Sequence, residues 1–213
     1  HQAEAHKEKA AAFAKEALCR KPGNKEAHCL LRDAAGGVLA DWNGANHREL
    51  IAFYQGFVRE NPDYPRGYLW LMDLLLADGR CKEARETLAR MGQADQSFRV
   101  LLYKGNICRA EGNLPEAERL WAEMTEKFPE NWLAWFSLAD ALASLARYEE
   151  AAPLYRKAFS LQPAPRYTDA LEALAWIAEI QGDLPDAVSI LEEVIALLER
   201  EWGLTEGENV EQY

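Results

Sequence analysis

The stretch EGNLPEAERLW, residues 111–121, recurs along the chain at a nearly constant spacing. QGDLPDAVSIL at 181–191 repeats it closely, LARYEEAAPLY stands between them at 145–155, and DGRCKEARETL precedes them at 78–88. The four copies start 33, 34 and 36 residues apart. Self-similarity at such a period is typical of proteins that stack one small structural unit many times. The chain is therefore expected to be an array of repeats.

Each copy has the residue types of a turn between two helices. Glycine adopts the left-handed backbone that ends many helices, and three copies have one at that point: Gly79, Gly112 and Gly182. Asn113 and Asp183 then have an acid three residues later, which is capping-box spacing at the start of a second helix. The pattern predicts a helix, a tight turn and an antiparallel second helix.

Small and large apolar residues alternate on the predicted second helices. One shared position is always alanine, which lets two helices approach closely: Ala84, Ala117, Ala151 and Ala187. Four residues later stands a larger side chain on the same face: Leu88, Trp121, Tyr155 and Leu191. We expect these larger residues to fill the gap between helices. Trp135, on a first helix, is expected to be a core residue as well.

At this point the sequence resembles the tetratricopeptide repeat family, whose 34-residue unit carries the pattern W-x2-L-G-x2-Y, then A-x3-F, then P. In residues 132–165, Trp135, Leu138, Ala151 and Pro163 match that pattern, and in residues 98–131, Gly105, Ala117 and Pro129 match it. The resemblance covers about residues 24–201. It implies an all-α fold, a right-handed α-solenoid of stacked antiparallel helix pairs.

The resemblance also implies a division of the chain. Residues 1–23 are expected to be the second helix of a truncated N-terminal repeat, so that the natural protein would continue upstream. Residues 24–64 form an irregular, lengthened repeat, in which Asn46 and Glu49 are expected to cap a helix. Four units follow, and an acidic tail comes last: 65–97, 98–131, 132–165, 168–201 and then 202–213. Asp63 and Asn131 are expected to cap the helices that follow them.

In this family the first helices line a concave groove, with side chains from set positions of each unit. Carried onto this sequence, those positions give a candidate groove made of Arg66, Leu69, Asp73, Arg99, Leu102, Asn106, Arg109, Leu133, Phe136, Asp140, Asp169, Glu172 and Trp176. The arginines fall in the earlier units and the acids in the later ones.

Two readings of this groove stay open. In the first, it binds an extended or helical peptide whose apolar side chains meet Leu69, Leu102 and Phe136 and whose acidic end meets Arg99 and Arg109. In the second, the charges pair across neighbouring helices and keep the groove soluble. A clamp for a peptide carboxylate, known in some family members, is not expected, because Asp73 and Asp140 would repel it.

Composition limits the partners. The net charge is −11 and the pI is about 4.9, so phosphate backbones and anionic lipid surfaces would repel this chain. We expect no nucleic acid and no membrane partner. The four cysteines show no metal or redox spacing and are expected to be small core residues in a reducing, cytoplasmic compartment. No catalytic motif, cofactor motif or metal-spaced cluster stands in the sequence, and adjacent acids such as Glu149 and Glu150 are expected to be solvated.

The sequence thus predicts a non-enzymatic protein–protein interaction module that takes a peptide or partner helix in its groove. An alternative is the sensor or oligomerisation domain of a larger bacterial transcriptional regulator with a helix-turn-helix. A third is a homo-oligomer in which a neighbouring chain fills the groove.

Overall fold

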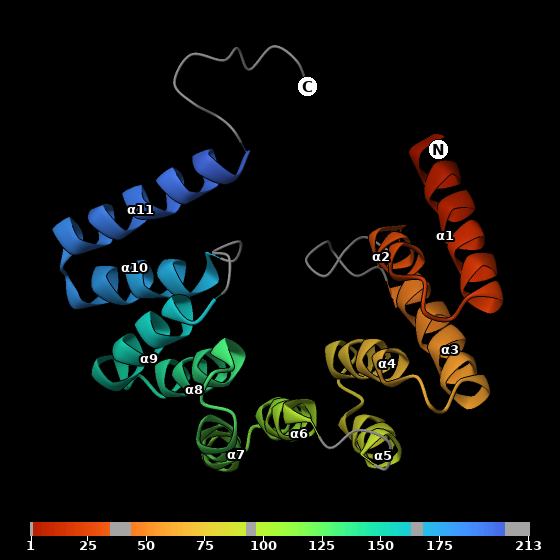
Figure 1. Cartoon of the computed structure of the whole chain (residues 1–213), viewed down its shortest axis with the longest axis horizontal. Helices are drawn as coiled ribbons and strands as arrows, with labels where there is room; N and C mark the ends of the chain where they lie inside the picture. Colours follow the sequence, from red (N-terminus) through yellow and green to blue (C-terminus); the bar gives the residue numbers. More distant parts are fainter. Residues whose placement is uncertain (1, 35–43, 93–96, 163–167, 203–213) are drawn as a thin grey trace. The chain divides into compact units, whose positions relative to one another are not determined.

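The structure of the protein is a computed structural model that describes residues 2–34, 44–92, 97–162 and 168–202 (Figure 1). Within these ranges the chain forms eleven α-helices and no strand. The helices are α1 (Gln2–Arg20), α2 (Lys25–Ala34), α3 (Gly44–Glu60), α4 (Pro65–Ala77), α5 (Cys81–Met91), α6 (Phe98–Ala110), α7 (Leu114–Lys127), α8 (Trp132–Ser144), α9 (Tyr148–Ser160), α10 (Asp169–Gln181) and α11 (Leu184–Trp202). The predicted all-α class is confirmed.

The chain divides into two compact units, residues 1–103 and residues 104–213. In the first unit α1 packs on α2, α3 on α4 and α4 on α5. In the second unit the helices pack in sequence order from α7 onward, with α8 on α7, α9 on α8, α10 on α9 and α11 on α10. Neighbours in sequence are therefore neighbours in space, as in a stack of helical repeats.

The four repeated stretches form the same turn. Gly79, Gly112 and Gly182 have φ angles of +70°, +79° and +80°, which confirms the predicted left-handed helix ends. After each, the next backbone N–H donates to the carbonyl five residues earlier, as in Arg80 to Leu75 at 2.8 Å and Asn113 to Cys108 at 2.8 Å. This bond satisfies a carbonyl that the helix end leaves without a partner. The turn is thus set by the end of the first helix.

Ala146 takes the glycine position of the third turn with a φ of +57°. Its Cβ crowds the backbone in this conformation, at a cost of roughly 1–2 kcal/mol. We expect Ala146→Gly to raise the free energy of unfolding by about 0.5–1 kcal/mol, because glycine also loses more entropy on folding. Gly112→Ala should lower it by a similar amount. Urea unfolding of both variants measures this, and equal signs for the two changes would contradict it.

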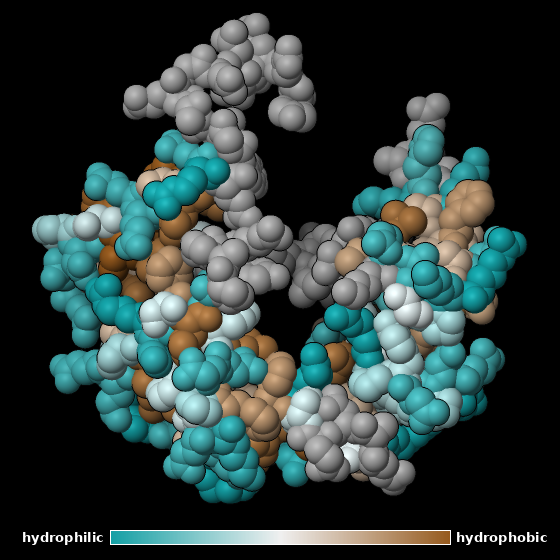
Figure 2. Space-filling model, viewed as in Figure 1, coloured by the Kyte–Doolittle hydropathy of each residue, from teal (hydrophilic) through white to brown (hydrophobic). Residues whose placement is uncertain are grey.

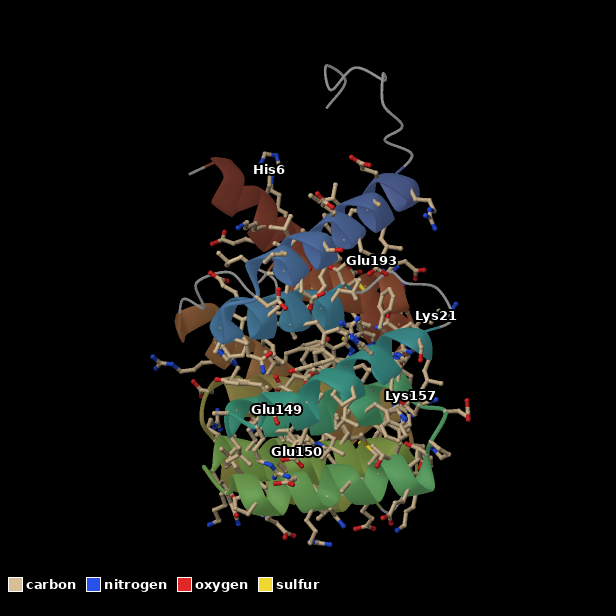
Figure 3. The ribbon with its side chains drawn as sticks, turned by 90° about the vertical axis from the view of Figure 1, so that its left-hand side faces the viewer. His6, Lys21, Glu149, Glu150, Lys157 and Glu193 are labelled. Carbon is tan, nitrogen blue, oxygen red and sulfur yellow. The ribbon has the colours of Figure 1, made fainter. Side chains whose placement is uncertain are left out.

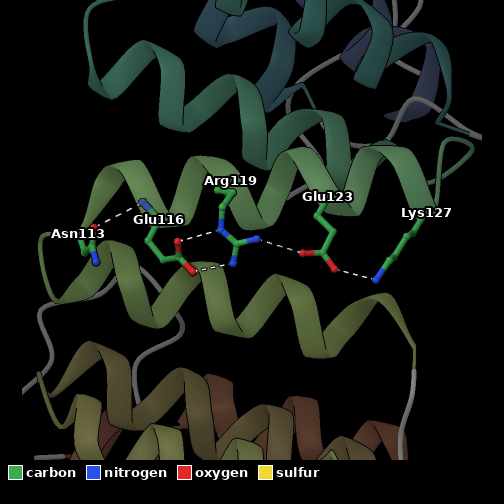
Figure 4. A network of polar contacts seen from close by, with 5 residues as sticks. All are labelled: Asn113, Glu116, Arg119, Glu123 and Lys127. Carbon is green, nitrogen blue, oxygen red and sulfur yellow. Dashed lines mark hydrogen bonds and ion pairs between the residues drawn. The ribbon is translucent and has the colours of Figure 1, made fainter.

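Side-chain caps start the second helices of two repeats. Asn113 Oδ1 accepts the backbone N–H of Glu116 at 3.4 Å, and Asp183 Oδ1 accepts that of Asp186 at 3.2 Å. The reciprocal half of the predicted capping box is missing at α7, because the Glu116 carboxylate pairs instead with Arg119 at 2.7 Å. Figure 4 shows that this pair begins a row of charges along α7.

Of the other three predicted caps, one is correct, one is wrong and one falls on a side chain outside the described residues. Asn131 caps α8, since its side chain accepts the N–H of Leu133 at 3.0 Å. Asp63 does not cap α4, because Pro65 opens that helix and Tyr64 takes the cap position without a side-chain bond. The predicted cap Asn46 lies within α3, which begins at Gly44, and its side chain is outside the described residues. A proline fixes where its helix starts more strongly than a nearby acid does.

The shared alanines let the helices meet closely. All four are buried, from fully for Ala84, Ala117 and Ala151 to 6% exposed for Ala187. Trp121 is fully buried and lies against Gly105 of α6, where an added Cβ would come within 2.3 Å of its indole nitrogen. Tyr155 and Leu88 are also buried.

The expectation for Leu191 is wrong, because its side chain is 46% exposed. α11 is the last described helix, and Ile190 and Val194 face its neighbour α10 instead. The expectation for Trp135 is only partly met, since the ring is half-buried and its Nε1 donates to the Pro129 carbonyl at 2.7 Å.

The core of the first unit holds a histidine that the sequence pattern did not mark. His28 of α2 is 1% exposed and lies among four aromatic rings with centroids 5.5–6.1 Å away: Tyr54, Phe57, Tyr64 and Trp70. One ring nitrogen is 2.9 Å from the Tyr54 hydroxyl and the other is 2.9 Å from the Pro22 carbonyl. A neutral imidazole satisfies both bonds by donating to Pro22 and accepting from Tyr54.

The cysteine expectation holds for one residue. Cys108 is buried, whereas Cys19 and Cys29 are exposed and Cys81 is half-buried. Cys19 and Cys29 lie on outward positions of α1 and α2, so they are not core residues.

Candidate partner-binding surface

In the first unit, the predicted groove residues lie on α4 and α6. Arg66 and Asp73 are exposed, whereas Leu69, Arg99 and Leu102 are half-buried. A contact joins the two helices, because the Tyr103 hydroxyl of α6 donates to Asp73 Oδ1 of α4 at 2.6 Å. Arg99 lies over the ring of its neighbour Phe98, with 5.0 Å from the guanidinium carbon to the ring centroid. Asp73 is therefore held by a phenol from the next first helix.

The carboxyl group of Asp73 has a raised pKa. The protein around it displaces water and raises the pKa of its carboxyl to about 6, although the hydrogen bond from Tyr103 acts in the opposite direction. The same pairing, with burial as the larger cause, raises the pKa of the Tyr103 phenol. The Asp73 side chain is nevertheless open to solvent, so we expect its effect on stability to be small.

Asp73→Asn should change how the stability of the first unit depends on pH. Between the unfolded pKa near 4 and the folded value of about 6, the folded protein holds a proton that the unfolded chain lacks. The contribution of Asp73 to stability therefore grows as the pH falls from 7 towards 4. At pH 7 the variant should be more stable than the parent protein, by about 1 kcal/mol or less. At pH 4 this difference in stability should disappear. Urea unfolding at both pH values tests this, with exposed Asp63→Asn as the control.

In the second unit, α6 and α8 are joined by an ion pair. The Arg109 guanidinium donates to Asp140 Oδ2, and its carbon lies 5.6 Å from the centroid of the Trp121 ring. The Tyr155 hydroxyl of α9 also bonds to Asp140, and burial together with that carboxylate raises the pKa of Tyr155. Charge pairing across neighbouring helices, the second reading of the groove, thus occurs at this position.

The remaining predicted residues of the second unit differ in exposure. Asn106, Leu133 and Phe136 are half-buried, and the Phe136 ring packs against Tyr155 with a centroid distance of 5.5 Å. Asp169 and Glu172 are exposed, and Glu172 accepts the Thr168 hydroxyl. Phe136 is therefore mainly a core residue.

Trp176 of α10 stands out among the predicted residues. Its side chain is 48% exposed, and Tyr148 of α9 meets it edge-on with a centroid distance of 5.6 Å. One turn later Ile180 is 47% exposed on the same helix face. This exposure shows that Trp176 is not a core residue, and that it lines a groove stays a prediction. Ile180 and the Tyr103 bond were missed, because the family pattern marks neither position.

The adjacent acids of α9 lie at the surface, as expected. Glu149 and Glu150 are exposed in the first turn of α9, and Arg147 donates to Glu150 at 2.7 Å. Figure 3 shows both acids at one end of this helix, with Lys157 towards the other. Acids at the first turn and a base near the last match the helix dipole. Among the described residues, no three His, Cys, Asp or Glu side chains gather in a way that could hold a metal ion.

A membrane span needs a helix that is both long and apolar. None of the described helices combines the necessary length with a sufficiently apolar sequence.

The comparisons with known proteins agree with the fold. Residues 104–165 and 145–200 match the family model described as tetratricopeptide repeat. Among solved structures, Cut9–Hcn1 of the APC/C is 15% identical, with a TM-score of 0.62 over 92% of this chain and 36% of that one. TTC0263, a thermophilic repeat protein of Thermus thermophilus, is 16% identical, with a TM-score of 0.61 over 75% of this chain and 87% of that one. MamA of Desulfovibrio magneticus RS-1 is 15% identical, with a TM-score of 0.54 over 73% of this chain and 87% of that one. No curated protein matches the chain closely.

Repeated helix pairs with the same glycine turn and the same buried alanine define an α-solenoid. Residues 104–200 belong to the tetratricopeptide repeat family. Membership of this family indicates a scaffold for protein–protein interaction.

Proposed function

We propose that the protein binds a peptide or a helix of a partner protein on the exposed residues of its first helices. The observation that carries this proposal is Trp176, a large apolar side chain that stays 48% exposed although Tyr148 fixes one edge of it. Tryptophan contributes more binding energy at protein interfaces than most residues, because it buries a large area at little entropic cost.

The residues around Trp176 indicate the ligand chemistry. Ile180 extends the apolar surface by one turn, and Glu172 and Glu179 are exposed on the same face of α10. A Lys or Arg of the ligand could pair with these acids and lie over the indole ring. We therefore expect a ligand that presents an apolar side chain next to a basic one.

The arginine side of the predicted groove contributes less in this proposal. Arg109 is already paired with Asp140, so an acidic ligand group would have to displace that carboxylate. Arg99 is half-buried against Phe98. Replacing both arginines removes contacts with an acidic end of the ligand, and replacing Trp176 removes contacts with its apolar part. The first change should therefore weaken ligand binding less than the second.

A selection of random peptides displayed on phage, followed by anisotropy titration of the selected peptides, tests the proposal. Trp176→Ala should weaken their binding by about tenfold or more, which corresponds to about 1.4 kcal/mol. Arg99→Ala combined with Arg109→Ala should have a smaller effect. Trp135→Ala is the matched control, because it removes another half-exposed indole from a first helix. Selected peptides that bind Trp176→Ala as tightly as the parent protein would refute the proposal.

A further inference from the structure

α11 carries a row of apolar side chains that stay exposed among the described residues of its unit. Leu184, Val188, Leu191 and Ile195 are 60%, 54%, 46% and 55% exposed. Their spacing of four, three and four residues puts them on one face of the helix, here called the α11 stripe. Figure 2 shows hydrophobic residues open to the surface over α10 and α11. A contiguous apolar surface of this kind marks an interaction site.

The preceding repeat shows what this face of a second helix does. Thirty-six residues earlier, α9 has Tyr148, Ala152, Tyr155 and Phe159 at the same positions. Tyr155 is 2% exposed, and the other three pack against the cluster that contains Leu171 and Leu174 of α10. In α7 the equivalent of Leu191 is the fully buried Trp121. In both earlier repeats this face is therefore part of the core.

Charge restricts which helix can lie on the α11 stripe. Glu192 and Glu199 are exposed beside it, and residues 192–213 hold seven Glu and one Arg. Residues 203–213 add three of these Glu and no basic residue, so neither they nor a second α11 complements the stripe electrostatically. The N-terminal segment does complement the acids beside the stripe, because residues 1–25 hold six Lys and Arg against three Glu.

α1 supplies both the charge and an apolar anchor. Phe13 is 69% exposed, the highest value among the exposed large hydrophobic side chains of the described chain. Ala10 and Ala17 lie on the same face one turn to either side and are half-buried. Lys9 and Arg20 border this face and are exposed, with Arg20 paired to Glu16 at 2.6 Å. α1 thus presents an aromatic side chain between two basic ones.

We propose that α1 of one copy of the protein docks on the α11 stripe of a second copy, with Phe13 against the stripe and the basic residues of α1 facing its acids. The two surfaces differ, so the contact is heterologous and can continue from copy to copy. Few residues take part, so we expect weak association that salt weakens further. This self-association does not depend on the peptide binding proposed above.

Sedimentation equilibrium of the 213-residue chain at increasing concentration, at low and high salt, tests the proposal. The average mass should rise with concentration and fall with salt. Phe13→Glu and Ile195→Glu should each remain at the mass of one chain. An equimolar mixture of the two should form dimers and nothing larger, because one intact α1 and one intact stripe remain. Leu30→Glu, at another exposed apolar residue of the first unit, is the control and should associate like the parent.

Three outcomes would overturn the proposal. A parent protein that keeps the mass of one chain at every concentration shows that α1 does not dock between copies. Loss of association in Ile195→Glu but not in Phe13→Glu shows that α11 pairs with something other than α1. Association that survives both changes shows that the contact lies elsewhere. Circular dichroism of each variant checks that it is folded, and Trp176→Ala should leave the association unchanged.

Discussion

Gly105→Ala is expected to lower the free energy of unfolding of the second unit by about 3 kcal/mol. An added Cβ would lie 2.3 Å from Trp121 Nε1 and 2.4 Å from Cε2, and the fully buried indole has no room to withdraw. α6 and α7 would have to move apart, which opens the core around Trp121. Urea unfolding with hydrogen exchange of peptides from α6 and α7 measures the loss.

Two variants make this result specific. Gly56→Ala changes a glycine inside α3 whose added Cβ would meet nothing within 4 Å, so it should gain about 0.5–1 kcal/mol from helix propensity. In a Trp121→Leu background, Gly105→Ala should cost much less, because the clashing ring is gone. An equal cost in both backgrounds would show that the indole is not the cause.

His28→Ala is expected to lower the free energy of unfolding of the first unit by about 3 kcal/mol at pH 7.5. The change leaves a cavity among four aromatic rings and removes the partner of the Tyr54 hydroxyl and of the Pro22 carbonyl. Hydrogen exchange of α2 and α3 peptides in urea measures the effect. His6→Ala, at an exposed histidine of the same unit, should change it little.

The pH dependence of the parent protein tests the same residue. Burial lowers the pKa of His28, while the bond to Pro22 acts against this and Arg66 adds to it. The unfolded chain therefore takes up a proton near pH 6.5 that the folded protein refuses, and stability falls as the pH drops below that value. This slope should be absent from His28→Ala. The slope of stability against pH that His28 causes is opposite in sign to the slope that Asp73 causes. Measuring His28→Ala and Asp73→Asn therefore separates the two contributions.

The sequence was sufficient for features that one repeat shares with the next. The glycine turns, the buried alanines and the Asn113, Asp183 and Asn131 caps all follow from local residue types, and the structure confirms them. Local geometry explains this, because a left-handed glycine or a capping side chain acts within a few residues.

Features that depend on residues far apart in the sequence could not be predicted from local residue types. Leu191 has the same register as Trp121, yet it is exposed on α11, the last helix that the structure describes. The bond from Tyr103 to Asp73 joins side chains 30 residues apart, and the aromatic surroundings of His28 come from two other helices and a turn. For the partner-binding surface, the register found positions on the first helices. It could not show that Phe136 is mostly engaged in the core while Trp176 remains open.

The charges along α7 have a consequence for the order of folding. Glu116, Arg119, Glu123 and Lys127 form a continuous row of pairs, at 2.7, 3.5 and 2.7 Å, between residues three or four apart. Such pairs between residues one turn apart stabilise a helix without closing any loop. Together with the Asn113 cap, these contacts lie within residues 113–127 and need no other part of the chain. We therefore expect α7 to be the first helix to form as the second unit folds, and its neighbours to be added onto it.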